Sequence, residues 1–263
     1  MSDMSGSGRP EGGPLSRGVS VIGFAHRGAR LEETENTIPA FRLALRAGAA
    51  GIETDCWLSA DGEVVCTHDA TVTVATGKGL RSRRHRLSVR STAAQDLAAA
   101  GVPRLGDVFG ELRREFGAFA VSIDAKHDDV VEPLLAVTET AGALDDLWLC
   151  HHDHTVLARH RGSTPAHLVH SRLRGTIETP IERHAFDLAE VGIEAMNFHH
   201  SEWTGGLVSL FHRFGVKAFA WDAQEVRHLR AMLAIGIDAL YCDRPDRMVA
   251  TVAAWRDRDL TGT

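Results

Sequence analysis

Short apolar runs alternate along the chain with segments whose apolar residues recur every three or four positions. Such runs are typical of buried strands, and such spacing is typical of amphipathic helices. The runs predict strands at 20–25, 50–55, 119–124, 146–150, 166–169, 193–197, 217–221 and 237–241. Helices are predicted near 37–48, 105–116, 129–141, 154–161, 180–189, 204–214, 224–235 and 245–256. Because parallel strands need crossover connections, these strand–helix pairs in 263 residues predict an α/β fold, a TIM (β/α)8 barrel.

The segment 37–48 illustrates the local signals. Asn36 or Thr37 can cap the first turn, which also contains Pro39. Gly48 can adopt the left-handed conformation that ends a helix. The apolar residues at helical spacing are Ile38, Phe41, Leu45 and Ala49. We therefore expect a helix with defined ends and one buried face.

Residues 57–104 interrupt the repeat between the second strand and its helix. Asp61-Gly62 predicts a hairpin turn between Trp57-Leu58 and Val64-Val65. We expect this insertion to lie over the carboxyl-terminal face of the barrel, where such folds carry their sites. It includes a basic run that is interpreted as a solvated loop or, alternatively, as a phosphate-facing patch. That run contains Arg81, Arg83, Arg84 and Arg86.

The composition is that of a globular protein, with 44% apolar and 24% charged residues. A net charge of −6 argues against non-specific nucleic-acid binding. The four cysteines contain no CxxC pair, which favours reduced core residues in a cytoplasmic protein. No apolar stretch is long enough to anchor the chain in a membrane. Residues 1–18 are rich in Gly, Ser and Pro and are expected to be a flexible tail, which leaves 19–263 for the barrel.

Carboxylates follow two neighbouring strands. Glu53 and Asp55 end one apolar strand and, two residues apart, share a face of it. Two adjacent carboxylates repel, and a divalent cation relieves the repulsion; oxygen ligands suit Mg²⁺ or Ca²⁺ better than zinc. Asp124, at the end of the next predicted strand, is a candidate third ligand. The alternative is a set of surface carboxylates paired with Lys126 and Arg27.

Two histidines flank this pair. His26 ends the first predicted strand and His68 ends the extended run after the hairpin, and imidazoles titrate near neutrality. A histidine at a strand end can simply be hydrogen-bonded, but two of them beside a carboxylate pair favour acid–base chemistry. Arg27 can bind a phosphoryl oxygen or form a salt bridge to a barrel carboxylate. Gly28 permits a tight turn or a close backbone approach.

The ordered motifs of the chain resemble the glycerophosphodiester phosphodiesterase family. The resemblance is carried by His26-Arg27-Gly28, Glu35-Asn36-Thr37, Glu53-x-Asp55 and Asp61-Gly62-x-Val64-x-x-His68-Asp69. It continues more loosely through Val102-Pro103-Arg104-Leu105, Gly236-Ile237-Asp238 and Asp243-Arg244-Pro245. Each motif alone is weak, whereas the ordered set, which covers about residues 20 to 250, is specific.

The resemblance implies a set of reacting groups. It places the two catalytic histidines at His26 and His68, and the first two metal ligands at Glu53 and Asp55. The third ligand falls on Asp124, where the family usually has Glu. The shorter side chain could shift the cation, admit a water or favour another metal.

The resemblance also implies residues that contact the substrate or support the site. Arg27 and Lys126 match phosphate-binding residues, and Trp221 matches an aromatic side chain on the substrate side. Glu35 matches a buried polar residue beneath the site, and Asp69 matches one that orients its loop. Two departures leave the fine specificity open: Asp222 stands where Thr or Val is usual, and Tyr241-Cys242 replaces Ile-Thr.

The implied function is metal-dependent hydrolysis of a small glycerophosphodiester to an alcohol and glycerol 3-phosphate. One histidine would deprotonate a substrate hydroxyl, which gives a cyclic phosphate, or a water; the other would protonate the leaving alkoxide. We interpret His26 as the base and His68 as the acid. The alternatives are a phosphodiesterase of the lysophospholipase D or sphingomyelinase D type, and a non-catalytic barrel that binds a phosphorylated ligand. The head group, the metal and the oligomeric state stay open.

Two other histidine-rich segments need an interpretation. His151-His152-Asp153-His154 partly resembles the metal-binding signature of metallo-β-lactamase-like hydrolases, but Leu149 stands where its first His should be. We expect it to end the fourth strand, with His151 or His152 lining the pocket. His199-His200 and Trp203 follow the sixth strand after Asn197. They either touch the alcohol part of the substrate or pack in a loop.

Overall fold

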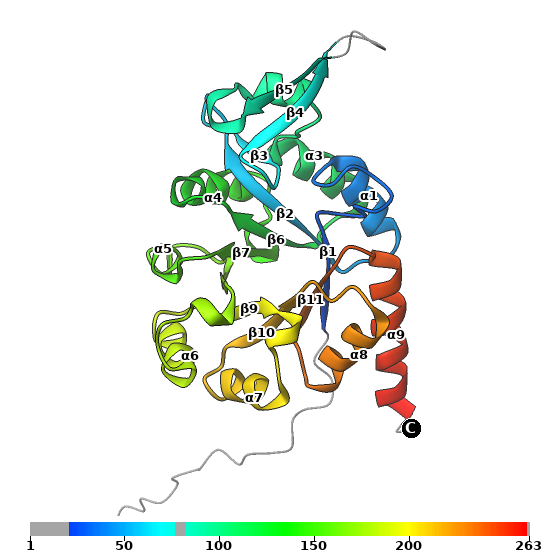
Figure 1. The fold of residues 1–263 in the computed structure, drawn as a ribbon, viewed down its shortest axis with the longest axis vertical. Helices are drawn as coiled ribbons and strands as arrows, with labels where there is room; N and C mark the ends of the chain where they lie inside the picture. Colours follow the sequence, from blue (N-terminus) through cyan, green and yellow to red (C-terminus); the bar gives the residue numbers. More distant parts are fainter. Residues whose placement is uncertain (1–20, 77–82, 262–263) are drawn as a thin grey trace, which may run out of the picture.

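The protein folds as a closed barrel of eight parallel strands inside a layer of helices (Figure 1). The computed structural model describes residues 21–76 and 83–261, so the predicted tail 1–18 lies outside the described residues. The barrel strands are β1 (Ile22–His26), β2 (Gly51–Leu58), β6 (Ala120–Ala125), β7 (Leu147–His151), β8 (His167–Ser171), β9 (Ala195–His199), β10 (Lys217–Trp221) and β11 (Ala239–Cys242). Closure comes from β1, which pairs in parallel with both β11 and β2. The predicted TIM barrel is confirmed.

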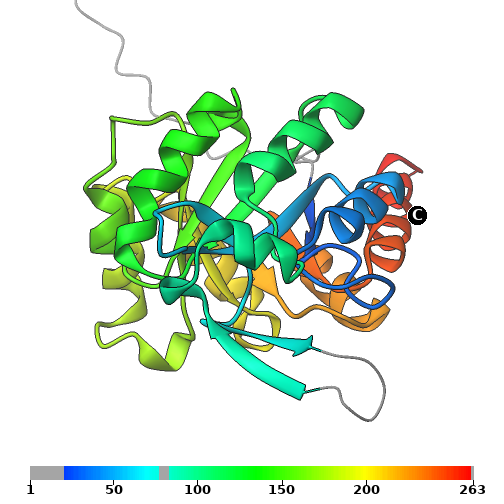
Figure 2. The same ribbon diagram turned by 90° about the horizontal axis from the view of Figure 1, so that it is seen from above.

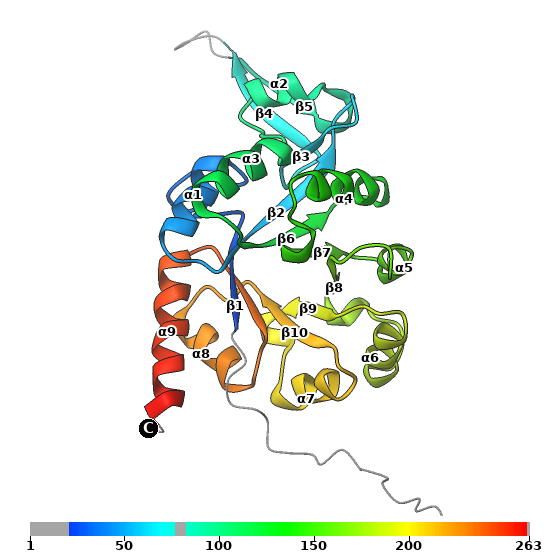
Figure 3. The ribbon, with the colours of Figure 1, turned by 180° about the vertical axis from the view of Figure 1, so that it is seen from behind.

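Helices surround the strands on all sides (Figure 3). They are α1 (Ile38–Arg46), α3 (Leu105–Phe116), α4 (Val131–Thr140), α5 (His154–Ala158), α6 (Ile181–Glu190), α7 (Gly205–Arg213), α8 (Val226–Ala234) and α9 (Pro245–Thr261). Short 3₁₀ helices occur at η2 (Val89–Ser91), η3 (Asp128–Val130), η4 (Leu144–Asp146), η5 (Arg174–Thr176) and η6 (His200–Glu202). Each predicted strand and helix is found with shifted ends; α5 is shorter than expected, and α9 is longer.

The first helix is capped by Thr37, whose hydroxyl accepts the N–H of Ala40 at 3.4 Å. Gly48 follows the helix with a φ of +89°, the left-handed conformation expected of a stop signal. Asn36, the other candidate cap, does not cap α1: its side chain bonds to Thr54 and Asp55 of β2. Asn36, predicted as a possible helix cap, is therefore a buried residue that contacts the end of a barrel strand.

Aromatic side chains fill the inside of the barrel. Phe24 stacks on Tyr241, with ring centroids 5.1 Å apart, and Phe219 packs against Trp148 at 5.0 Å. All four are buried. A larger apolar cluster lies between the strands and the helices. The interior of the barrel is thus a packed core and not an open channel.

The insertion after β2 begins as predicted, with a hairpin. β3 (Val64–Cys66) pairs antiparallel with β2, and the register sets Leu58 opposite Val64 around the Asp61-Gly62 turn. The rest forms a separate sheet of β4 (Thr71–Thr76) and β5 (Arg83–Ser88), followed by α2 (Ala94–Ala99). Arg90 pairs with Asp129, which follows β6, so the insertion lies on the carboxyl-terminal side of the barrel. Figure 2 shows β4 and β5 projecting from one edge of the barrel.

The basic run was predicted to be a solvated loop, and this prediction is wrong for the part that the structure describes. Arg83, Arg84 and Arg86 belong to β5, and Arg81 lies outside the described residues. The overlooked signal is the β-branched alternation of Thr71–Thr76, which supplies a partner strand for a sequence with little apolar periodicity of its own. The Arg86 guanidinium donates to the hydroxyl of Thr71 on that strand.

The cysteines lie in the core, as was predicted from their spacing. Cys56, Cys66, Cys150 and Cys242 are all buried and free. Among the described residues, no helix combines the length and the apolar character needed to span a bilayer.

Candidate active site

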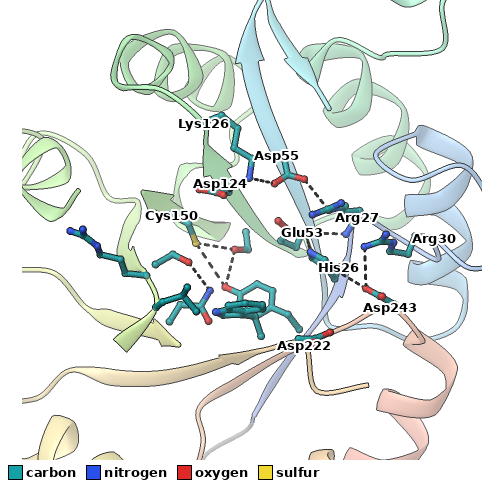
Figure 4. Close-up of a pocket in the computed structure, with 17 residues that line it drawn as sticks. His26, Arg27, Arg30, Glu53, Asp55, Asp124, Lys126, Cys150, Asp222 and Asp243 are labelled. Carbon is teal, nitrogen blue, oxygen red and sulfur yellow. Dashed lines mark hydrogen bonds and ion pairs between the residues drawn. The ribbon is translucent and has the colours of Figure 1, made fainter. Parts of the chain in front are cut away.

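A pocket of about 340 Å³ opens at the carboxyl ends of the barrel strands. Every barrel strand contributes a residue to its wall. In strand order these residues are His26, Glu53, Asp124, Cys150, Ser171, Asn197, Trp221 and Tyr241. Figure 4 shows that most of the labelled charged side chains gather at the ends of β1, β2, β6 and β11, whereas Asp222 lies apart from them. The polar strand ends that the sequence singled out therefore meet in one cavity.

Most of the predicted site residues line this pocket. Seven of them do: His26, Arg27, Glu53, Asp55, Asp124, Lys126 and Trp221. His68, Glu35 and Asp69 do not. Neither Arg84 nor Arg86 is part of the wall, so the structure does not place a phosphate-facing patch there.

His26 is held by a partner that the sequence analysis had treated only as part of a motif. Its Nδ1 lies 2.6 Å from Oδ1 of Asp243, and its Nε2 lies 3.8 Å from Oε2 of Glu53. Burial alone would lower the pKa of His26, but the charge of Glu53 and the bond to Asp243 outweigh it and raise the pKa. Asp243 in turn forms an ion pair with Arg30, whose Nη1 lies 3.7 Å from its Oδ1. His26 is therefore an oriented imidazole whose protonated form is stabilised.

The turn after β1 brings the backbone and side chain of Arg27 into the site. Arg27 has a φ of +57° and Gly28 one of +81°. A Cβ at Gly28 would lie 2.6 Å from the carbonyl carbon of Ala40, so the close approach expected there is present. The N–H of Arg27 donates to Oε2 of Glu53 at 3.0 Å, and its Nε lies 3.1 Å from Oδ2 of Asp55. The turn thus directs one donor and one positive charge at the carboxylate pair.

Glu35 contacts Arg27 from outside the pocket. Its Oε1 accepts Nη1 of Arg27 at 3.1 Å, and its Oε2 pairs with Arg30 at 3.0 Å. The side chain is 34% exposed, so it is not the buried residue that the resemblance implied. It holds two arginines at the pocket edge.

Asp55 is the most enclosed of the carboxylates, with a side chain only 3% exposed. Nζ of Lys126 lies 2.6 Å from its Oδ1 and 2.7 Å from Oδ2 of Asp124, so one ammonium bridges the two acids. Burial would raise the pKa of Asp55, but Lys126 and Arg27 outweigh burial and lower it. The same two acids overcome the effect of burial on Lys126 and raise its pKa.

Glu53 lies 3.8 Å from the imidazole of His26, but no lysine or arginine side chain among the described residues forms an ion pair with it. Burial and the nearby charge of Asp55 raise the pKa of Glu53 to about 7. The site therefore contains a buried carboxyl group whose negative charge is only partly compensated. This donor set fits a hard divalent cation in its chemistry, because such an ion is held by oxygen ligands and favours the ionised form of Glu53.

The three predicted metal ligands lie in one pocket, but their oxygens are farther apart than in a site that holds a cation. Glu53, Asp55 and Asp124 line one pocket beside His26. Within residues 21–76 and 83–261, however, they do not offer three oxygens that all lie within 4.8 Å of one another. Between Asp55 and Asp124 stands the ammonium of Lys126.

His68 lies outside the pocket wall. Its side chain is 40% exposed, and its Nδ1 lies 2.8 Å from Oδ1 of Asp69, the neighbouring residue that was expected to orient this loop. The main-chain carbonyl of His68 accepts the indole N–H of Trp57 at 3.2 Å. A positive charge on His68 acts on Asp55 and favours its ionised form. The imidazole is thus close enough to influence the carboxylates without lining the cavity.

The floor and far wall contain residues that the sequence analysis did not assign. The hydroxyl groups of Ser122 and Tyr241 lie 3.0 Å apart at the floor. Arg172 and Leu173, which follow β8, also line the pocket. Ser122 could have been found from the sequence, because it precedes Asp124 by two residues and shares its face of the strand. The loop after β8 carried no such signal.

The two other histidine-rich segments, 151–154 and 199–203, differ in where their residues lie. His151 is fully buried at the end of β7, where its Nδ1 accepts the N–H of Asp153, and His152 is exposed. Neither lines the pocket, so the expected role there is wrong. The buried indole of Trp203 donates to the carbonyl of Phe219 at 2.7 Å, which is a packing role.

These features define a class of protein: a TIM barrel whose pocket, at the carboxyl ends of the strands, combines arginine, lysine and histidine side chains with buried carboxylates. The chain matches the model of the glycerophosphoryl diester phosphodiesterase family over residues 26–247. It belongs to this family, as its ordered motifs predicted.

Known proteins similar to this chain agree. A glycerophosphodiester phosphodiesterase of Bacillus altitudinis is 27% identical over 237 residues, which are 86% of this chain and 96% of the relative. A crystal structure of a putative glycerophosphoryl diester phosphodiesterase from Silicibacter pomeroyi is 19% identical, with a TM-score of 0.79 over 90% of this chain and 95% of the other. An Oleispira antarctica phosphodiesterase in complex with its product sn-glycerol-3-phosphate is 18% identical, with a TM-score of 0.73 over 88% and 96%. At these identities the two structures show the shared fold.

Proposed function

We propose that the protein is a phosphoric diester hydrolase that cleaves glycerophosphodiesters to an alcohol and glycerol 3-phosphate with the help of a divalent cation. The observation that carries the proposal is the oriented imidazole of His26, hydrogen-bonded to Asp243 and facing buried carboxylates in the pocket. Family membership supports the reaction class. The product bound to the Oleispira protein supports glycerol 3-phosphate as the part that such a pocket holds.

The phosphodiester would bind where positive charge lines the pocket. Arg27 and Lys126 present a guanidinium and an ammonium on the side formed by β1, β2 and β6. Both are already paired with carboxylates, so they are held in place before the substrate arrives. Charges fixed in advance stabilise a transition state without reorganisation at the moment of reaction.

Glu53, Asp55 and Asp124 would hold the cation, and their oxygen donors suit Mg²⁺ or Ca²⁺. When bound, a divalent ion neutralises the phosphoryl oxygens and the charge that develops on them. Asp124 in place of a longer Glu is compatible with this role, because its side chain lines the pocket and is held there by Lys126.

His26 would transfer the proton at the nucleophile. Asp243 fixes the imidazole through Nδ1, which leaves Nε2 directed to the Glu53 side of the pocket. The carboxylate also stabilises the imidazolium that forms when Nε2 accepts a proton. The nucleophile would be a water, which gives glycerol 3-phosphate directly, or a substrate hydroxyl, which gives a cyclic phosphate that water must then open.

His68 would protonate the leaving alkoxide. Its imidazole is exposed beside Asp69 and acts electrostatically on Asp55, so it borders the pocket from the insertion. Trp221 lines the wall on the β10 side, where the alcohol part can contact it. The predicted partner is a small glycerophosphodiester, since charged side chains such as Arg27, Lys126 and Asp124 line the pocket.

The test is hydrolysis of glycerophosphocholine with added Mg²⁺ or Ca²⁺, measured as release of choline and glycerol 3-phosphate. His26→Ala and His68→Ala should each lower kcat at least a hundredfold, the usual size of a general acid–base contribution. The matched control is His167→Ala, which removes a histidine–carboxylate pair with Glu194 at the start of β8 and should retain activity. Histidine variants with the parent rate would contradict the two-histidine assignment.

The same assay separates the alternatives. A parent protein that releases no alcohol from any glycerophosphodiester with either metal would be a non-catalytic phosphate-binding barrel. Preferred cleavage of lysophosphatidylcholine or sphingomyelin would place it with the lipid-cleaving phosphodiesterases. Retained activity in a chelator would contradict the cation requirement.

A further inference from the structure

Three potential metal ligands meet at the barrel rim, away from the acidic cluster. His199 ends β9, His200 follows it in η6, and Asp222 follows β10. Nε2 of His199 lies 3.1 Å from Oδ2 of Asp222. Within the part of the chain that the structure describes, these three side chains alone offer ligand atoms that all lie within 4.8 Å of one another. We propose that His199, His200 and Asp222 form a second metal site, which takes a transition-metal ion such as Zn²⁺.

The histidine rings are held in place by packing. The ring of His199 meets Trp221 edge to face, with centroids 4.6 Å apart, and the ring of His200 stacks on His228 at 4.3 Å. Among the described residues, no hydrogen-bond partner contacts either ring nitrogen of His200. A half-buried imidazole with free nitrogen atoms and a fixed ring plane is a preorganised donor.

Asp222 is held in a conformation that directs its carboxylate to the histidines. It has a φ of +63°, an uncommon backbone for any residue other than glycine. Its Oδ1 accepts the side-chain amide of Gln224 at 3.1 Å, which leaves Oδ2 facing His199. Supporting bonds of this kind orient ligands in metal sites.

The protonation states are compatible with metal binding. Nδ1 of His199 lies 2.7 Å from the hydroxyl of Ser201. The backbone N–H of Ser201 donates to the same Nδ1 at 3.3 Å, so without a metal Nε2 carries the proton and donates it to Oδ2 of Asp222. A cation bound at Nε2 would displace that proton, as metal binding to a histidine requires. Burial and the two neighbouring imidazoles lower the pKa of His200, which favours the neutral ring that a metal needs.

The chemistry and position of this site differ from those of the carboxylate cluster. Two imidazoles and one carboxylate suit zinc, whereas three carboxylates suit Mg²⁺ or Ca²⁺. In the strand order, β10 is four strands from β6, which is half of the eight-stranded circuit. Figure 4 accordingly shows Asp222 across the pocket from Asp124 and Lys126. Asp222 lines the pocket as well, so the second ion would border the same cavity without sharing the first ion's ligands.

The test is a Zn²⁺ titration of the purified protein against a chromophoric chelator, with excess Mg²⁺ to occupy the carboxylates. The parent should bind one Zn²⁺ per chain. His200→Ala and Asp222→Asn should each weaken that binding at least tenfold, and Asn tolerates the left-handed backbone of position 222. His167→Ala is the control, because it removes a histidine–carboxylate pair without a third ligand and should bind as the parent does. X-ray absorption of the zinc-loaded parent should report two imidazole ligands.

Glu53→Gln distinguishes this site from the carboxylate cluster, because it should leave Zn²⁺ binding unchanged. Equal zinc affinity in the parent and in a folded His200→Ala variant would overturn the proposal. So would loss of zinc binding in Glu53→Gln together with its retention in Asp222→Asn. Thermal unfolding of each variant establishes that it is folded. The outcome does not depend on the phosphodiesterase assignment, since the readout is binding.

Discussion

At the scale of single residues, Lys126 is the group on which the acidic cluster depends. Its ammonium is shared by Asp55 and Asp124, and it occupies the position of a cation between them. The lysine also explains why a nearly inaccessible aspartate can stay ionised. Removing one partner of a buried ion pair is costly, because the other charge is left uncompensated.

We therefore predict that Lys126→Met lowers the free energy of unfolding at pH 7 by about 2–4 kcal/mol in a chelator. The folded-state pKa of Asp55 is lowered, so its contribution to stability is present above the ordinary pKa of 3.8 and is lost on acidification. The deficit of the variant should therefore shrink below that pH. Urea unfolding at pH 3 to 7 measures both effects, and Lys126→Arg is the charge-retaining control. A deficit that does not depend on pH would contradict this electrostatic account.

Gly28 and Gly62 provide a matched pair for the turn that places Arg27. Both have a φ of +81°, but a Cβ would collide with the backbone of Ala40 at Gly28 and would meet nothing within 4 Å at Gly62. Gly62→Ala should cost about 1 kcal/mol from the left-handed backbone alone. Gly28→Ala should cost about 3 kcal/mol or more, because strain and overlap add. Chemical denaturation compares the two, and equal losses would show that the contact with Ala40 relaxes freely.

Residue-scale prediction succeeded where the signal was local. Charged residues two apart at the end of an apolar strand, such as Glu53 and Asp55, share a face, so their place in the pocket follows from strand periodicity. The partner of His26 did not follow from it. Asp243 reaches His26 only because β11 pairs with β1, a contact across 217 positions in the chain. Asn36 was ambiguous because a cap and a buried amide have the same sequence signature.

At the scale of elements, the barrel strands were predictable because each is a short, largely apolar segment followed by a helical pattern. The insertion was not. β4 and β5 form a separate two-stranded sheet. The basic sequence of β5 has no strand pattern of its own, and it is a strand because it pairs with Thr71–Thr76. Ala70 and Val89, which flank this pair, are themselves joined by a backbone hydrogen bond of 3.0 Å.

Because its two ends meet, the β4–β5 pair should be removable. Replacing residues 71–88 by two glycines should leave cooperative unfolding intact and cost about 1 kcal/mol, chiefly from the lost packing of Val72. Activity on a small glycerophosphodiester should stay within tenfold, since no residue of the pair lines the pocket. The control replaces α2, whose Ala94 and Leu97 are buried, and should unfold more easily. A glycine variant without a cooperative transition would show that β4–β5 is part of the barrel core.

At the scale of the whole molecule, the pocket joins strands from both ends of the chain. β1, β2, β6 and β11 supply the acids, the histidine and the basic groups, and these strands close the barrel. The charge state of the cluster therefore bears on the stability of the entire fold. Glu53 is the sensitive group, because burial and Asp55 raise its pKa from an ordinary 4.5 to about 7.

The raised pKa of Glu53 means that the folded state retains a proton which the unfolded chain has lost. Stability should therefore fall as the pH rises from about 4.5 through 7, by about 3 kcal/mol in total in a chelator. Glu53→Gln should flatten this decline, and excess Mg²⁺ should offset it in the parent by favouring the ionised carboxylate. Thermal unfolding between pH 5 and pH 8 measures both, with NaCl of equal ionic strength as the control. Parallel profiles for parent and variant would contradict the assignment.

The bond between His26 and Asp243 also sets an order of events during synthesis. One residue lies on the first strand of the barrel and the other directly after the last. During translation His26 leaves the ribosome early, whereas Asp243, 217 positions later in the chain, leaves it near the end of synthesis. Until β11 docks between β10 and β1, the histidine lacks the carboxylate that orients it, so the pocket should stay inert through almost all of translation.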